Sequence, residues 1–215
     1  MQNNFQVSTM YLYFDGCSYT RGGPELYDRE SENFPTLVSN HFKAEFLNNA
    51  VGGSSNDLIT QRSFEFLEHY TCDYAIILLT HPERLRFNKT TYPNRDRNFY
   101  EKYYNDEVGS LNFYKNRYIL EQTFRKRNIP LLLLQYIDIP GDNVYKRMCN
   151  GSLQSVVGHV FFKRQKSILG KRRNEEYYYS EKQGEILSHF NKKGHRKIAD
   201  YIIKELSSAH GFLTI

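Results

Sequence analysis

Residues 10–20 read MYLYFDGCSYT, an apolar run that stops at a Gly-Cys-Ser turn. A short run rich in aromatic residues that ends in such a turn predicts a buried β-strand. In open α/β sheets, ligands bind outside the carboxyl ends of the strands. The stretch therefore predicts a first strand that delivers the hydroxyl of Ser18 to the binding edge of a sheet, as a candidate nucleophile. The alternative is that Ser18 caps the following helix, because Ser is a favoured N-cap residue.

The remainder of the chain alternates between strand-like and helical segments. We expect strands at 10–15, 44–48, 73–80 and 129–136, and helices at 34–42, from Ser54 or Ser55 to about Tyr70, at 111–127 and at 191–208. Segment 73–80 is almost continuously apolar, which is typical of a parallel strand covered on both faces. The alternation predicts one doubly wound α/β domain over residues 1–215, with a mostly parallel sheet. Two stretches, about 86–110 and 140–183, are too long for plain connections, and we expect them to be excursions that frame the pocket.

Composition favours a globular protein of a reducing compartment. The chain has 215 residues, 18 Tyr, 15 Phe and no Trp. Its three cysteines are an odd number, which argues against a disulfide framework. The sequence starts with polar residues and contains no run of about 18 apolar residues. We therefore expect a soluble, cytoplasmic protein, and the absence of metal-ligand spacing predicts neither metal nor cofactor.

The net charge of +5 is concentrated in one segment. Residues 142–182 carry nine basic and four acidic side chains, an excess equal to that of the whole chain. A solvated surface insertion explains such a run, as charge runs usually do. The alternative is nucleic-acid binding, because the segment also contains the triplet 177–179, YYY, and aromatic residues between cations suit single strands.

Polar residues with the chemistry of acyl transfer follow the expected strands. Ser18 follows the first strand, Gly52, Gly53 and Asn56 follow the second, and Thr80 and His81 end the third, while His189 precedes the last helix. The carboxyl ends of parallel strands meet at one edge of a sheet. Acyl transfer needs a nucleophile, a base and N–H groups aimed at a developing oxyanion. These residues supply all three.

Three blocks of the sequence resemble the SGNH hydrolase superfamily, the GDSL-like esterases. They are DGCSYTRG at 15–22, NAVGGSSN at 49–56, and HFNKKGH at 189–195, and they occur in the family's order over most of the chain. The resemblance implies a flavodoxin-like, three-layer α/β/α fold with about five strands. It also implies Ser18 as the nucleophile, His189 as the base and Gly53 as an oxyanion donor. The residues of these blocks most resemble those of divergent family members from phage and environmental genomes.

The chain departs from the family pattern in its oxyanion donors and beside the nucleophile. Cys17 stands where the family usually has an Asp before the catalytic serine. The family also places an Asn after the third strand, and this chain has none there. Asn56, Thr80 or His81 are the candidate substitutes.

A second departure concerns the acid. The family places an Asp three residues before the catalytic His, and that position here is Ile186. Glu185, one residue further back, is the candidate acid, with Glu181 and Asp138 as other carboxylates. A Ser-His dyad supported by a backbone carbonyl is a further alternative.

These features predict a serine hydrolase that cleaves an acyl ester of a small or carbohydrate-borne substrate, as an esterase or deacetylase. An SGNH-like domain without activity, used for binding or as a phage accessory protein, is the alternative that the missing Asn and the displaced acid suggest. Nucleic-acid binding through residues 142–182 ranks last, because no nucleic-acid-binding motif accompanies the charge.

Overall fold

The computed structural model describes residues 9–87, 90–92, 102, 104–135, 139, 144–145, 148, 160–164, 179–180, 185–186 and 189–210. The strands of its main sheet are β1 (Tyr11–Asp15), β2 (Glu45–Asn48), β3 (Tyr74–Leu79), β6 (Leu131–Gln135) and β7 (Val160–Arg164). They form a five-stranded sheet in the order β2-β1-β3-β6-β7, and every neighbouring pair is parallel. Taken in chain order, this is the 2-1-3-4-5 order of flavodoxin-like sheets.

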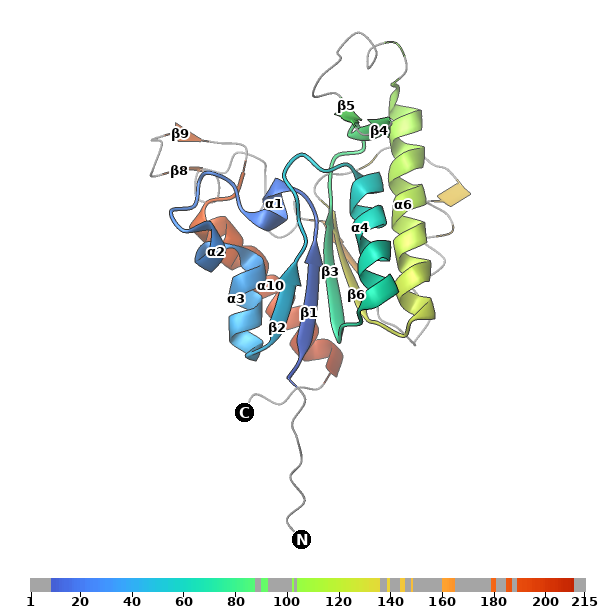
Figure 1. The fold of residues 1–215 in the computed structure, drawn as a ribbon. Helices are drawn as coiled ribbons and strands as arrows, with labels where there is room; N and C mark the ends of the chain where they lie inside the picture. The colour runs from blue at the N-terminus through green and yellow to red at the C-terminus, as the bar shows by residue number, and fades with distance from the viewer. Residues whose placement is uncertain are drawn as a thin grey trace.

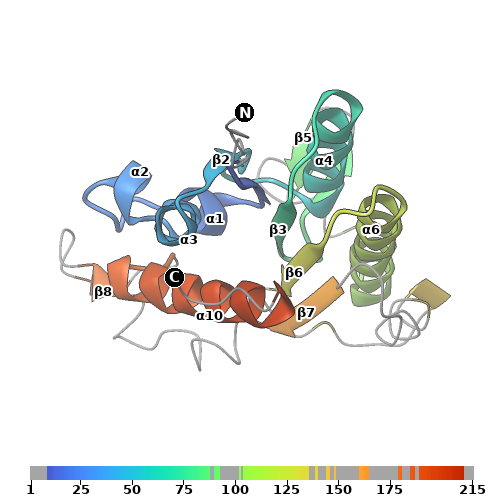
Figure 2. The same cartoon turned by 90° about the horizontal axis from the view of Figure 1, so that it is seen from below.

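Helices cover both faces of this sheet, as Figures 1 and 2 show. One face carries α3 (Phe34–Phe42) and α10 (Lys192–His210), and the other carries α4 (Asn56–His69) and α6 (Asp106–Lys126). The short helices α1 (Ser18–Arg21) and α2 (Arg29–Glu32) lie in the connection between β1 and α3. Two small antiparallel pairs complete the described elements: β4 (Leu85–Phe87) with β5 (Thr90–Tyr92), and β8 (Tyr179–Ser180) with β9 (Glu185–Ile186). The three-layer α/β/α expectation is confirmed.

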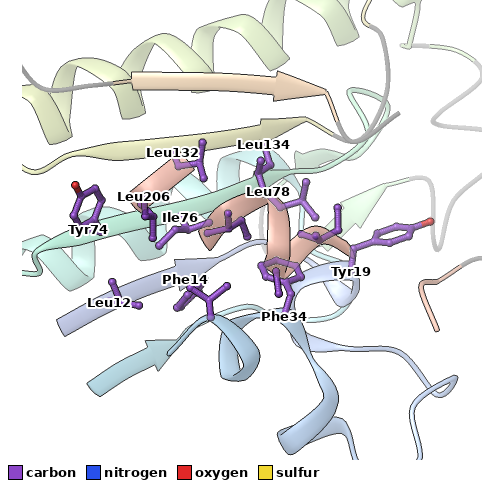
Figure 3. Close-up of a cluster of buried hydrophobic side chains, with 14 of the residues drawn as sticks. Leu12, Phe14, Tyr19, Phe34, Tyr74, Ile76, Leu78, Leu132, Leu134 and Leu206 are labelled. Atoms are coloured by element: carbon purple, nitrogen blue, oxygen red, sulfur yellow. The ribbon is translucent and has the colours of Figure 1, made fainter. Parts of the chain in front are cut away.

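Alternation along the strands divides the core into two clusters. Leu12 and Phe14 pack with Ile76 and Leu78 against the α3 and α10 side, in the cluster drawn in Figure 3. Tyr13 and Ala75 face the opposite way, into the cluster that includes α4 and α6 residues. Successive side chains of a strand point to opposite faces, so one apolar run fills both layers. This explains why 73–80 looks continuously apolar.

Local sequence signals set the helix starts. The Asn33 side chain accepts the Thr36 N–H at 2.9 Å, and the Ser55 hydroxyl accepts the Leu58 N–H at 3.3 Å. Helix α6 begins at Asp106, earlier than expected from periodicity, because Asn105 caps it through the Val108 N–H at 2.8 Å. Such caps satisfy N–H groups that have no partner within the helix.

The two expected excursions contain regular structure where they are described. The β4–β5 hairpin lies in the first of them, and β7 lies in the second. The basic segment 142–182 otherwise falls mostly outside the described residues, so its predicted role in nucleic-acid binding stays a prediction. Among the helices described, none is long and apolar enough to cross a membrane.

Candidate active site

The turn after β1 presents Ser18 at the carboxyl edge of the sheet. Ser18 is the first residue of α1, and the carbonyl of Cys17 accepts the N–H groups of Thr20 and Arg21 at 2.9 and 3.1 Å. Cys17 itself is fully buried and belongs to the core cluster of the α3 side. The tight turn thus sends the thiol into the core and leaves the neighbouring hydroxyl partly exposed.

Ser18 and His189 are hydrogen-bonding partners. Ser18 Oγ lies 2.8 Å from His189 Nε2, although 171 positions separate the two residues. A neutral imidazole has one donor and one acceptor nitrogen. With the proton on Nδ1, Nε2 accepts the Ser18 O–H, which is the arrangement that general-base activation of a serine requires.

The carboxylate at the other imidazole nitrogen belongs to Glu25. Glu25 Oε1 lies 3.1 Å from His189 Nδ1 and also accepts the His189 backbone N–H at 3.1 Å. Its side chain is 0% exposed. Ser18, His189 and Glu25 therefore form a continuous hydrogen-bonded chain, in which the carboxylate favours the Nδ1–H tautomer.

Glu25 was not among the residues expected from the sequence, which pointed to Glu185. The structure places Glu185 in β9, opposite Ser180, and describes nothing of its side chain. Glu181 and Asp138 lie outside the described residues. Family spacing directed attention to residues just before His189, whereas Glu25 precedes it by 164 positions and directly follows the run Gly22-Gly23-Pro24.

Gly23 allows this acid to approach the histidine. A Cβ built on Gly23 would lie 2.0 Å from Glu25 Oε2 and 2.7 Å from His189 Cβ. Real Cβ atoms do not approach other atoms so closely, so a side chain here would push the acid and the base apart. The run Gly22-Gly23-Pro24-Glu25 was the available signal for the missed acid.

Aromatic side chains fix the imidazole from the sides. The ring centroids of Tyr19 and His189 are 5.0 Å apart, and Phe190 lies 5.0 Å from Tyr19. Tyr19 is 3% exposed and Phe190 is fully buried. Tightly packed neighbours restrict the rotamer of the base, as precise positioning of a catalytic group requires.

The glycine loop lies next to Ser18. A Cβ built on Gly52 would contact Ser18 Cβ at 3.9 Å, and Gly53 turns the chain with φ of +77°. Within the described part of the chain, the backbone N–H groups of Ser18, Gly52 and Gly53 donate no hydrogen bond. The serine turn and the neighbouring glycine loop thus hold N–H groups that have no partner in the fold, the kind of group that stabilises an oxyanion.

The three proposed substitutes for the family's Asn do not gather at Ser18 in the contacts described. Asn56 is fully buried, and its Oδ1 accepts the Thr80 N–H at 2.8 Å while its Nδ2 donates to the Thr80 carbonyl at 3.3 Å. Its amide therefore ties the start of α4 to the end of β3. His81 Nδ1 lies 3.8 Å from Glu83 Oε1. Asn56 acts here as a structural link between α4 and β3, and the N-cap of α4 is Ser55.

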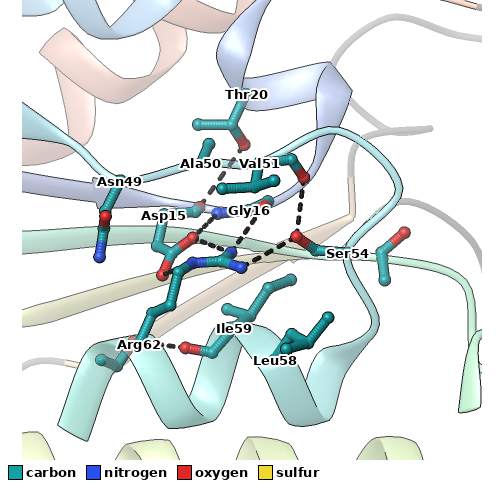
Figure 4. A network of polar contacts seen from close by, with 12 residues as sticks. Asp15, Gly16, Thr20, Asn49, Ala50, Val51, Ser54, Leu58, Ile59 and Arg62 are labelled. Carbon is teal, nitrogen blue, oxygen red and sulfur yellow. Dashed lines mark hydrogen bonds and ion pairs between the residues drawn. The ribbon is translucent and has the colours of Figure 1, made fainter. Parts of the chain in front are cut away.

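A partly buried ion pair connects the turn after β1 with the glycine loop (Figure 4). Arg62 donates to Asp15 Oδ1 and Oδ2 at 2.5 and 3.2 Å, to the Gly16 carbonyl at 3.0 Å and to Ser54 Oγ at 3.0 Å. Burial raises the pKa of Asp15 to about 6, although Arg62 and the Gly16 N–H oppose that shift. Arg62 thereby holds the serine turn and the glycine loop in one arrangement, a role that the sequence did not reveal.

His195 has a structural role on the α10 side. It is fully buried, and its Nδ1 accepts the Phe34 N–H at 3.2 Å, which joins the start of α3 to α10. Burial, with a smaller contribution from His189, lowers its pKa to about 3, so the ring is neutral. No group of three or more His, Cys, Asp or Glu side chains suited to a metal occurs among the residues described.

The fold of this chain, a parallel sheet in this strand order with a serine turn after its first strand, is similar to that of solved structures described as G-D-S-L family proteins and esterases. A protein assigned to the G-D-S-L lipolytic family, from Desulfitobacterium hafniense DCB-2, superposes with a TM-score of 0.61 at 14% identity, over 91% of this chain and 99% of that one. The acetyl xylan esterase Est2A from the rumen bacterium Butyrivibrio proteoclasticus gives 0.63 at 16% identity, over 97% of this chain and 66% of its own.

The acetylxylan esterase Axe2 from Geobacillus stearothermophilus gives a TM-score of 0.60 at 13% identity, over 93% of this chain and 94% of that one. No protein-family model matches the sequence, and no curated protein matches it. At these identities the likeness concerns the fold, and the fold that the sequence resemblance implied is confirmed.

Proposed function

We propose that this protein is a serine hydrolase of the SGNH superfamily that cleaves acyl esters, with Ser18 as the nucleophile, His189 as the base and Glu25 as the acid. The observation that carries the proposal is the 2.8 Å separation of Ser18 Oγ and His189 Nε2 within the chain that ends on Glu25. A serine that only caps a helix has no need of a histidine and a buried carboxylate hydrogen-bonded in series to its hydroxyl, so this contact favours the nucleophile over the cap.

In the first step, Ser18 Oγ attacks the ester carbonyl carbon while its proton passes to His189 Nε2. The imidazolium that forms faces the carboxylate of Glu25, which stabilises its positive charge. Backbone N–H groups of Ser18 and of Gly53 hold the oxyanion, and Gly52, which borders Ser18, is the second candidate for the glycine donor. No side-chain amide is assigned to this role, because Asn56 is bound to Thr80.

The tetrahedral intermediate collapses when the alcohol leaves with the proton from His189, and Ser18 keeps the acyl group. Water then attacks the acyl-enzyme while His189 accepts a proton from it, and the acid is released as Ser18 recovers its own proton. The esterase neighbours that act on acetyl xylan suggest the substrate class, an acetyl ester carried by a carbohydrate.

A domain without activity is the competing proposal, favoured by the absence of an Asn after β3. A fluorophosphonate probe and the turnover of p-nitrophenyl acetate separate the two. We expect the wild type to be labelled and to turn over, Ser18→Ala to lose both, and His189→Ala to lose about a thousandfold in kcat. Ser208→Ala, which changes an exposed serine on α10, is the matched control and keeps both signals. Wild-type protein that neither labels nor hydrolyses short acyl esters would establish the inactive alternative.

A further inference from the structure

A cavity of about 580 Å³ lies beside the candidate active site, between the segment after α1 and the exposed edge of β2. Its lining includes Arg21, Tyr27, Arg29, Phe46 and Asn48. Arg21 ends the short helix that Ser18 begins, and residues one helical turn apart have Cβ atoms about 5–6 Å apart.

The cavity also adjoins the other parts of the site. Pro24 and Leu26, on either side of Glu25, line it, and so does Ala50, which precedes the glycine loop by two residues. Close sequence neighbours of Ser18, Glu25 and the glycine loop thus line the cavity.

Two arginines line this cavity, and one asparagine links their backbones. The amide Nδ2 of Asn33 donates to the backbone carbonyls of both Arg21 and Arg29, at 3.4 and 2.7 Å. The stem of Arg29 also packs on Gly22, where an added Cβ would lie 2.9 Å from Arg29 Cγ. The backbones of the two residues are thus tied together, and both side chains line the same cavity.

No carboxylate compensates this charge by a direct ion pair. Glu30 also lines the cavity, yet in the part of the chain that the structure describes neither Arg21 nor Arg29 has a carboxylate oxygen within 4.0 Å. The charged lining side chains are two cations and one anion, so the cavity has a net positive charge. Guanidinium groups bind carboxylates through two parallel hydrogen bonds, which makes an anion with that geometry the fitting ligand.

Two exposed aromatic rings accompany the arginines. Tyr27 is 67% exposed and Phe46 is 37% exposed, and both line the cavity. Exposed aromatic faces in a cavity offer flat apolar surfaces with few rotatable bonds, which suit the C–H faces of a sugar ring.

From this arrangement we propose that the cavity binds the alcohol part of the substrate, and that this part is a carbohydrate carrying a carboxylate, as in a uronic acid. The proposal rests on the acyl-ester hydrolysis proposed above and specifies its substrate. Arg21 and Arg29 bind the sugar carboxylate, Tyr27 and Phe46 contact the ring, and the ester on that sugar reaches Ser18. When the acyl group moves to Ser18 Oγ, the C–O bond to the sugar breaks and the sugar hydroxyl leaves with the proton from His189.

The test compares three acetyl esters at low salt: an O-acetylated oligogalacturonate, an O-acetylated xylo-oligosaccharide and p-nitrophenyl acetate. We expect the wild type to prefer the uronate over the xylo-oligosaccharide by about tenfold or more in kcat/KM, through KM, as charge-assisted hydrogen bonds allow. The preference should weaken as salt is raised. Arg21→Gln and Arg29→Gln should each reduce it, whereas Arg196→Gln, which removes the same charge from an exposed site on α10, should keep it.

The outcomes separate this inference from the proposed function. Turnover of all three esters without a preference for the uronate overturns the inference and leaves the esterase proposal intact. A stronger preference for a sulfated or phosphorylated acetyl sugar overturns the carboxylate assignment. If the wild type hydrolyses none of them, the esterase proposal fails, and calorimetry with oligogalacturonate then tests uronate binding by the cavity. Binding that Arg21→Gln and Arg29→Gln abolish supports the inference. Absence of binding overturns it.

Discussion

Replacing Glu25 by Gln removes one negative charge from the side chain behind His189 and changes almost nothing in its shape. Glu25 Oε1 accepts two N–H groups of His189, one from the ring and one from the backbone. The backbone group is always a donor, so in Glu25→Gln the amide oxygen stays toward His189 and the amide nitrogen takes the place of Oε2. The tautomer of His189 is therefore retained, and the loss reports the missing charge.

The size of that loss follows from the distance between the charges. Oε1 and Nδ1 are 3.1 Å apart, and both charges are spread over their groups. Two unit charges about 4 Å apart in a medium of effective dielectric constant about 20 interact by about 4 kcal/mol. Because the imidazolium exists in the transition state and not in the resting enzyme, this corresponds to about a thousandfold lower kcat.

The assay is the turnover of p-nitrophenyl acetate by Glu25→Gln, with Glu185→Gln as the matched carboxylate-to-amide control. We expect the control to stay within about twofold of the wild type. Urea unfolding of each variant verifies that it is folded. A folded Glu25→Gln enzyme within tenfold of wild-type kcat, or a large loss in Glu185→Gln, would refute the assignment of the acid.

Three further perturbations test the surroundings of the site. Gly23→Ala places a Cβ 2.0 Å from Glu25 Oε2, so we expect kcat to fall by at least about tenfold and the free energy of unfolding by about 1–3 kcal/mol; unchanged turnover would contradict the close approach. Asp15 has a pKa of about 6 in the fold against 3.8 for the free group, so its contribution to stability is full below pH 4 and decreases as the pH rises to 6. Urea titrations should show the stability of the wild type relative to Asp15→Asn larger at pH 4 than at pH 7 by about 3 kcal/mol, and equal values would exclude the shift. His195, with a pKa of about 3 against 6.5, acts in the opposite sense: its contribution is present above pH 6.5 and is lost as the pH falls. His195→Asn should remove up to about 5 kcal/mol of that acid-induced loss, and an unchanged pH profile would argue against a neutral buried ring.

Much of the fold was predictable because its signals are local. The apolar runs of β1 and β3 need only their own residues to show a buried strand, and the helix at 34–42 was expected with the bounds that it has. The strand β7 was not expected, because it lies in the segment read as a basic excursion. Its place in the sheet depends on pairing with β6, a contact that local propensity does not encode.

Within the candidate site, motif order predicted Ser18 and His189, which the structure places in hydrogen-bonding contact. It did not predict Glu25 or Arg62, because each acts through a partner far along the chain, 164 positions away for His189 and 47 for Asp15. Asn56 was expected as a possible oxyanion donor because it is an amide close to the glycine loop. In the structure its amide is bound to Thr80 instead.

The sequence by itself determined the layers of this protein, the serine turn and the histidine before the last helix, because strand period, turn residues and caps act over a few residues. Tertiary structure alone decided the acid behind the histidine, the arginine that joins the two site loops, and the gathering of two arginines in one cavity. Their positions depend on the path of the loop between α1 and α3 and on how closely glycines let it approach its neighbours. Glu25 becomes the partner of His189 because the loop folds back against it, and the spacing of residues in the sequence does not show such a contact.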